Sequence, residues 1–221
     1  MDIPVLYEDP HLLVCIKPRG VLSQSDSKGK AAMPELLSER CGGEIFPVHR
    51  LDGDVSGVMV YAKTKKAAAG LSQLVSDHEK FVKTYYAVVE GEPASDGVLE
   101  DLLFHDRFKN KTYVVDRMRG GVKSAKLSYE TLATVEAGEG LMTLVKIRLY
   151  TGRSHQIRVQ FSSRGMPLAG DKKYGSKTGG AIALFSRGLC FDHPVIKKKM
   201  DISALPPADI PWTMFGEVIN G

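Results

Sequence analysis

Residues 49–60, with the sequence HRLDGDVSGVMV, join a polar turn to an apolar, strand-like run. His49, Arg50 and Asp52 place a base, a guanidinium and a carboxylate close together at the start of that run. In an extended segment, Arg50 and Asp52 point to the same side while Leu51 points away. An Asp-Gly pair is also common in ordinary turns, and for Asp52 taken alone that interpretation stays open.

A second polar cluster occupies residues 151–158, with the sequence TGRSHQIR. Arg158 lies one turn after Ser154 on a predicted helix, where an arginine is usually a solvated surface group. The alternative is that Arg158 is the counter-charge of Asp52, which would keep the carboxylate ionised and oriented, as a nucleophile or base requires. Such an acid suits the site of an anionic ligand, so the two clusters favour an enzyme that acts on nucleic acid.

Composition sets broad limits on the class of protein. The chain has 221 residues, of which 43% are hydrophobic, and this is enough for one large domain or two small ones. We expect a single domain over residues 1–221, because no linker rich in Gly, Ser or Pro interrupts it. The net charge of +4 permits a polyanionic partner without requiring one.

Cysteine usage and hydrophobicity indicate the compartment. Cys15, Cys41 and Cys190 are widely spaced and form no Cys-x-x-Cys, so we expect neither a disulfide framework nor a sulfur-rich zinc site. No segment approaches the roughly 20 apolar residues of a membrane helix. The sequence therefore predicts a cytoplasmic protein with no membrane partner.

Periodicity predicts strands joined by a few helices. The segment 96–121 is polar and basic and is expected to form an exposed hairpin or loop; it carries Arg107, Lys109, Lys111, Arg117 and Arg119. The other predicted elements are strands at 3–7, 12–16, 58–62, 83–91, 124–133, 141–149, 181–185 and 188–191, and helices at 33–41, 65–79 and 153–163.

Other candidate residues have ordinary alternatives. Of the adjacent Tyr85 and Tyr86, one must pack inward, and the other has the shape to stack on a flat ligand. His49, His155 and His193 are far apart in sequence, so we interpret them as hydrogen-bonding groups; a metal-dependent hydrolase would need them to converge. No Walker loop or Gly-x-Gly-x-x-Gly is present, so no nucleotide cofactor is expected.

These motifs together resemble those of the RluA-type pseudouridine synthases, in order and spacing over almost the whole chain. The central signature is similar at residues 49–52, 56–58 and 62–63, and a second at the alternating residues 83–91. The remaining similar segments are residues 6–9, 17–20, 151–158, 165–175 and 189–194, the fourth including Gly170-Asp171 and Tyr174-Gly175.

The resemblance implies an α+β fold with a mixed, mainly antiparallel sheet, flanking helices and loops, and a central RNA-binding cleft. It implies one catalytic domain over 1–221 and no separate N-terminal S4-like RNA-binding domain. Four residues depart from the family's usual pattern and are expected to affect substrate contacts: Val55, Leu127, Gln160 and Phe185.

The resemblance also implies roles for single residues. Asp52 would be the essential catalytic acid, Arg158 its ion-pair partner, Tyr85 a ring near the target base, and Arg50 a group that enters the RNA stack where the uridine leaves. We expect further RNA contacts from His49, Arg50, Lys63, Lys109, Lys111, Arg153, His155 and Gln156.

The expected reaction converts uridine in structured RNA, rRNA or tRNA, to pseudouridine. The N1–C1′ bond breaks, the uracil turns and C5 rejoins the ribose, with no metal or cofactor. Whether the carboxylate attacks C1′, attacks C6 or removes a ribose proton stays open. The base must leave its stack, which favours loop uridines. The alternative is a non-catalytic RNA-binding or remodelling protein on the same scaffold; either way we expect a monomer.

Overall fold

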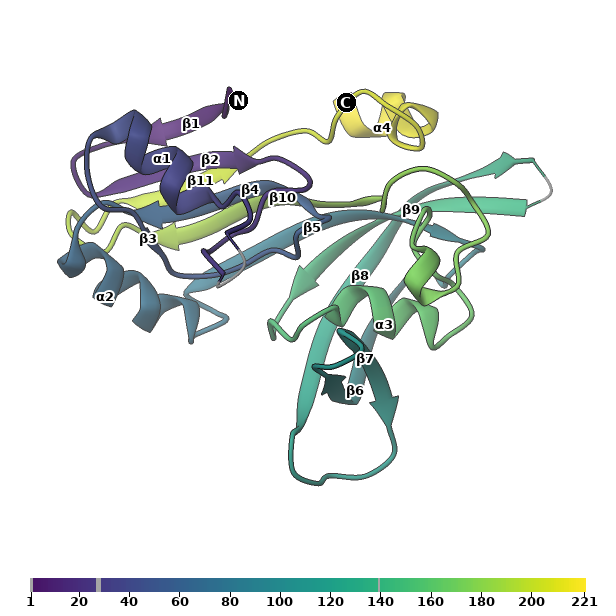
Figure 1. The fold of residues 1–221 in the computed structure, drawn as a ribbon. Coiled ribbons are helices and arrows are strands. Elements are labelled where there is room, and N and C mark those ends of the chain that lie inside the picture. The colour runs from purple at the N-terminus through teal and green to yellow at the C-terminus, as the bar shows by residue number, and fades with distance from the viewer. Residues whose placement is uncertain (1, 27–28, 139) are drawn as a thin grey trace. The chain divides into compact units, whose positions relative to one another are not determined.

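The computed structural model describes residues 2–26, 29–138 and 140–221 (Figure 1). Internal contacts divide the chain into two compact units. The first unit comprises Met1–Lys83 and Phe185–Ala204, and the second comprises Thr84–Leu184 and Leu205–Gly221. A single catalytic domain over the whole chain stays a prediction, and each unit is described by itself below.

The first unit is built on a mixed sheet with the strand order β1-β2-β4-β10-β11, with β3 added beside β4. All of these pairs are antiparallel except β4 with β10, which is parallel. The elements are β1 (Val5–Glu8), β2 (Leu12–Lys17), α1 (Met33–Cys41), β3 (Phe46–Pro47), β4 (Ser56–Ala62), α2 (Lys65–Val75), β10 (Leu184–Asp192) and β11 (Lys199–Ser203).

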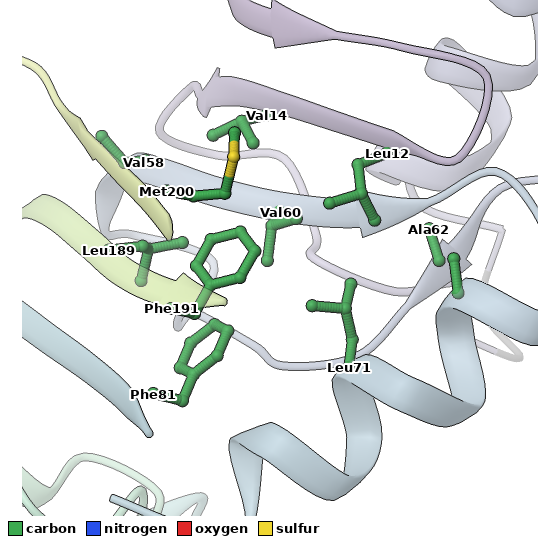
Figure 2. Close-up of a cluster of buried hydrophobic side chains, with 11 residues drawn as sticks. Leu12, Val14, Val58, Val60, Ala62, Leu71, Phe81, Leu189, Phe191 and Met200 are labelled. Atoms are coloured by element: carbon green, nitrogen blue, oxygen red, sulfur yellow. The ribbon is translucent and has the colours of Figure 1, made fainter. Parts of the chain in front are cut away.

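The core of this unit follows from strand alternation. Alternate residues of β2 and β4 face α2, and Phe81 stacks on Phe191 with ring centroids 5.1 Å apart (Figure 2). This burial of aliphatic and aromatic surface is what stabilises the strands that carry the residue 49–60 segment. The fully buried members include Leu12, Val14, Val58, Val60, Ala62, Ala67, Leu71 and Phe81.

Two helices of this unit were expected, and one is shorter than expected. The helix at 33–41 is confirmed as α1, with Gly42 in the left-handed conformation at its C-terminus (φ 66°). The helix predicted over 65–79 begins as expected, where the Thr64 side chain accepts a hydrogen bond from the Ala67 amide, but it ends at Val75. The Asp77 carboxylate instead closes a turn by accepting the amides of residues 79 and 80.

The second unit contains an antiparallel sheet with the strand order β5-β9-β8-β6-β7, packed with α3. The predicted excursion 96–121 is a regular hairpin of β6 and β7, which pair from Leu102 with Val115 to Asp106 with Lys111. The elements are β5 (Phe81–Glu90), β6 (Asp96–Asp106), β7 (Lys111–Val115), β8 (Val122–Ala137), β9 (Gly140–Leu149), α3 (Gln156–Ser162), η1 (Lys172–Tyr174), η2 (Trp212–Phe215) and α4 (Gly216–Asn220).

Two boundaries late in the chain were predicted wrongly. The strands expected at 181–185 and 188–191 form one strand, β10, whose partner β11 was not predicted. The helix expected at 153–163 begins only at Gln156, because His155 has a left-handed backbone (φ 53°). The Gln156 side chain accepts hydrogen bonds from the Thr151 hydroxyl and the Arg153 amide, and these bonds hold the preceding segment as a turn.

In the part of the chain that the structure describes, no helix combines the length and apolar character that a bilayer crossing requires.

Candidate active site

Asp52 lies in a tight turn of the first unit, between β3 and β4. The Val55 amide donates to the Asp52 carbonyl oxygen at 3.0 Å, which closes the turn. On the other side, the Ser23 hydroxyl donates to the Leu51 carbonyl at 2.7 Å and accepts from the Leu51 amide at 2.9 Å. The Leu51 side chain is buried, while Asp52 is half-buried. The carboxylate is thus carried on a backbone held from both sides, as a catalytic group needs.

A buried lysine supports the same turn. Lys17 is fully buried, and its ammonium donates to the carbonyls of Pro18 at 2.8 Å, Val21 at 2.6 Å and Gly53 at 3.2 Å. Burial lowers the pKa of Lys17 to about 8, against the opposing effect of the nearby Asp52 and Asp54 charges. Sequence reasoning noted Lys17 only as part of a similar segment, because nothing in the sequence shows that its side chain reaches the residue after Asp52.

His49 and Arg50, which precede Asp52, differ in burial and in contacts. His49 is half-buried, and its Nε2 accepts a hydrogen bond from the Val60 amide at 3.1 Å, so the neutral ring carries its proton on Nδ1. Burial, helped by the Lys83 charge, lowers the pKa of His49 to about 3. Arg50 is exposed. This contact makes His49 a support for the turn, and RNA contact by either residue stays a prediction.

Arg158 on α3 is buried in the second unit and is not a solvated surface group. It makes a two-point ion pair with Asp171, Nε to Oδ2 at 2.6 Å and Nη2 to Oδ1 at 2.8 Å, with side chains 3% and 1% exposed. Its guanidinium carbon lies 5.0 Å from the Tyr174 ring centroid. Asp52 belongs to the first unit and Arg158 to the second, so their pairing stays a prediction. Asp171 is a partner that sequence reasoning missed, although Gly170-Asp171 stood in a similar segment.

A hydrogen-bond network ties this ion pair to the β6–β7 hairpin. The Tyr174 hydroxyl lies 2.9 Å from His155 Nδ1 and accepts from the Thr112 amide on β7 at 2.8 Å. The Thr112 hydroxyl donates to the Ser154 carbonyl at 2.7 Å. Burial lowers the pKa of His155 to about 3, so its imidazole is neutral near pH 7. The predicted contact of His155 with RNA therefore competes with these internal bonds.

Gln156 and Tyr85, also predicted site residues, lie in the interior of the second unit. The Gln156 side-chain amide donates to the Lys126 carbonyl at 3.1 Å and to Gln160 at 3.0 Å. Tyr85 on β5 pairs with Ile147 on β9 and is 5% exposed, whereas Tyr86 is half-buried. Stacking of Tyr85 on a base stays a prediction.

The predicted basic contacts differ in how exposed they are. Lys63 forms an ion pair with Glu8 at 2.6 Å, which lowers the pKa of that carboxyl. Arg153 donates to the Ser124 carbonyl at 2.9 Å, and Lys111 lies 5.3 Å from the Tyr174 ring centroid. The remaining basic residues of the 96–121 segment, Arg107, Lys109, Arg117 and Arg119, are exposed. A surface pocket of about 560 Å³ lies at the end of β7 and the loop after it, lined by Val114, Val115, Asp116, Arg117 and Arg119.

The four departures from the family pattern are interior residues. Val55, Leu127 and Phe185 are at most 2% exposed. Gln160 is also buried and donates to the Leu99 carbonyl at 3.1 Å and to Asp101 at 2.7 Å. Since these side chains pack or hydrogen-bond inside their units, the departures alter packing rather than exposed substrate contacts.

The three histidines considered for a metal have separate partners. His193 lies 2.9 Å from the Asp9 carboxylate, while His49 and His155 bond to Val60 and Tyr174 as described. Across residues 2–26, 29–138 and 140–221, no group of three or more His, Cys, Asp or Glu side chains is arranged to hold a metal ion.

The chain is similar in sequence to a known family and to curated relatives. The pattern of the family described as RNA pseudouridylate synthase matches residues 11–163. The "Ribosomal large subunit pseudouridine synthase D" of Zymomonas mobilis is 34% identical over 95% of this chain and 71% of its own length. The "Dual-specificity RNA pseudouridine synthase RluA" of Yersinia pestis is 35% identical over 86% of this chain and 92% of its own length.

A solved structure shares the fold. The structure titled "Human RNA Pseudouridylate Synthase Domain Containing 4" aligns with a TM-score of 0.74 and 24% identity, over 92% of this chain and 88% of that chain. The expected α+β fold with a mixed, mainly antiparallel sheet is confirmed by this likeness and by the strand pairing.

Proposed function

The chain belongs to the RNA pseudouridylate synthase family and isomerises uridine in RNA to pseudouridine, and we propose that Asp52 is the residue on which this reaction depends. The expected RluA-type resemblance is thereby confirmed. No finding favours the alternative of a non-catalytic RNA-binding protein.

The observation that carries the role of Asp52 is the construction of its turn. An acid in an ordinary surface turn needs no buried support, yet this one has Ser23 on the preceding residue and the Lys17 ammonium on the following one. These bonds limit backbone motion, so the Cα–Cβ bond of Asp52 has a defined direction. The nearby positive charge of Lys17 also favours the ionised form of the carboxylate, as a nucleophile or base requires.

We propose that Arg158 and Tyr85 complete the catalytic group. Arg158 is held in place by Asp171, so its guanidinium is oriented before substrate binds. Tyr85 would present a ring beside the flipped uracil. We further propose RNA contacts from the basic groups Arg50, Lys63, Lys109, Lys111 and Arg153, whose charges suit phosphates.

The substrate is proposed to be a uridine in a loop of rRNA or tRNA. The relative from Zymomonas is named for the large ribosomal subunit. A loop base is already partly unstacked, so moving it into a pocket requires less free energy than in a duplex. A map of pseudouridines in cellular RNA, with and without the gene, would identify the RNA and the position. We also propose that the protein acts as a monomer in the cytoplasm. Light scattering after size-exclusion chromatography measures the oligomeric state.

Asp52→Asn tests the catalytic assignment, because it removes the ionisable oxygen with little change of volume. We expect at least about a 10³-fold loss of tritium release from 5-labelled uridine in RNA, with RNA affinity and thermal unfolding unchanged. Asp54→Asn, at an exposed residue of the same turn, is the matched control and should retain near-parent turnover. Tritium release by Asp52→Asn at the parent rate would show that another group performs the chemistry.

A further inference from the structure

The tip of the β6–β7 hairpin has a fixed backbone. Asp106 Oδ1 accepts hydrogen bonds from the Phe108 amide at 2.9 Å and from the Lys109 amide at 3.0 Å. Asn110 then takes a left-handed conformation (φ 44°), and its carbonyl accepts from the Lys173 ammonium at 3.1 Å. A tip held in this way presents its side chains in a defined direction.

The side chain presented at that tip is an aromatic ring. Phe108 is 103% exposed, so its ring is fully open to water. An isolated exposed apolar residue is unremarkable, but here the same stretch collects several. Of the ten large hydrophobic residues exposed in the described chain, half lie between residues 98 and 118: Val98, Phe108, Tyr113, Val114 and Met118.

The charge around the ring is mainly positive. Arg107 and Lys109 flank Phe108 directly, and both are exposed. The acid beside them, Asp106, uses one carboxylate oxygen to hold the turn. An exposed ring between cations is the arrangement by which proteins bind single-stranded nucleic acid, since the ring stacks on a base while the cations contact neighbouring phosphates.

We propose that Phe108 stacks on an unpaired base of the RNA substrate, outside the group that reacts, with Arg107 and Lys109 on the adjoining phosphates. This inference rests on the proposed function, which supplies RNA as the ligand. Stacking would give the hairpin tip a role besides non-specific charge attraction. A base can stack on the ring only when it is not paired in a duplex. The tip thereby favours RNA that has an unpaired nucleotide.

Phe108→Trp makes the stacking observable. The chain has one tryptophan, Trp212, which is 3% exposed, so the difference between variant and parent isolates the signal of the tip. Titration with a single-stranded oligouridylate should quench the fluorescence of the variant, and a duplex of equal length should quench it much less. An unquenched signal on binding, or equal quenching by both, would overturn the proposal.

Kinetics supply a second test. Phe108→Ala should raise the KM for RNA about fivefold or more without lowering kcat, while Phe108→Tyr, which keeps a ring, should restore the parent KM. Ile196→Ala is the matched control, because it truncates an apolar side chain that is 54% exposed in the first unit. The fully exposed ring supports no packing, so thermal unfolding of Phe108→Ala should match the parent.

The two possible failures can be told apart. If the parent releases no tritium from any RNA tested, the proposed function fails. If the parent is active and Phe108→Ala has the parent KM, only the stacking inference fails, and the exposed ring would then serve a partner of another kind, such as a protein.

Discussion

The ion pair between Arg158 and Asp171 joins two side chains that water barely reaches. Two short bonds connect groups that are almost completely buried, and removing either partner would leave an uncompensated charge in the interior. A guanidinium can donate in two parallel directions, whereas an ammonium is a point charge. The geometry therefore depends on arginine rather than on positive charge alone.

Arg158→Lys should lower turnover about tenfold or more although charge is retained, because lysine cannot reproduce the two-point bond with Asp171. Single-turnover tritium release measures the effect, with thermal unfolding measured alongside. Arg164→Lys is the control, since Arg164 pairs with Asp101 near the surface and its side chain is 33% exposed. Near-parent turnover in a folded Arg158→Lys protein would reduce Arg158 to a structural residue.

Lys17 gives a prediction about pH. Its pKa is lowered to about 8, so the ammonium is charged below that pH and becomes a neutral amine above it. Its hydrogen bond to the Gly53 carbonyl is charge-assisted only below that pH, and the turn that carries Asp52 should loosen as pH rises. We expect kcat to fall as pH rises through about 8.

The control for this pH effect is Lys17→Met, which removes the titrating group. Its kcat should be lower than that of the parent near neutral pH and should show no fall through pH 8. An alkaline fall of equal size in parent and variant would assign the titration to another group.

Among the elements, the segment from the tip of the β6–β7 hairpin to the loop after β7 concentrates positive charge: residues 107–119 include five basic residues and one acid, Asp116. Replacing Lys109, Lys111, Arg117 and Arg119 together with glutamine should weaken RNA binding. It should also reduce the slope of log affinity against log salt, by about 0.7–0.9 for each phosphate that the variant no longer binds. Titrations of binding at several salt concentrations measure both effects.

A matched charge removal distinguishes this prediction from a change of net charge. Replacing four of the lysines that are exposed in the first unit with glutamine should leave the salt slope unchanged: Lys66, Lys197, Lys198 and Lys199. If the hairpin variant kept both slope and affinity, RNA would be held elsewhere, with Lys63, Lys172 and Lys173 the next residues to change.

Elements whose pattern is local were predicted well. The helix at 33–41 was predicted from its own sequence. The strands at 12–16, a short run rich in branched side chains, and at 141–149, an alternating segment, lie where expected. The helix at 65–79 was predicted four residues too long, because His78 falls at helical spacing after Leu74 and Val75, whereas the Asp77 turn ends the helix. Strand β11 was missed because a short edge strand is defined by its partner, β10, and not by its own pattern.

Across the molecule, the family match spans residues 11–163 and so includes parts of both compact units. The proposed catalytic group draws on both units as well, with Asp52 in the first and Arg158 and Tyr85 in the second.

Residue order alone was enough to predict the family, the fold class and the two polar clusters, because motif order, residue type and hydrophobic period are properties of the chain. The sequence also indicated Asp52, because an acid that lies between an arginine and a predicted strand can be recognised from neighbouring residues alone. It did not predict the support of the Asp52 turn by Lys17, or of Arg158 by Asp171. Those bonds join residues separated by 36 positions, from Lys17 to Gly53, and by 13 positions, from Arg158 to Asp171. Such partners become known only from the folded chain, because long-range side-chain contacts are set by how strands and loops pack and not by the residues' neighbours in sequence.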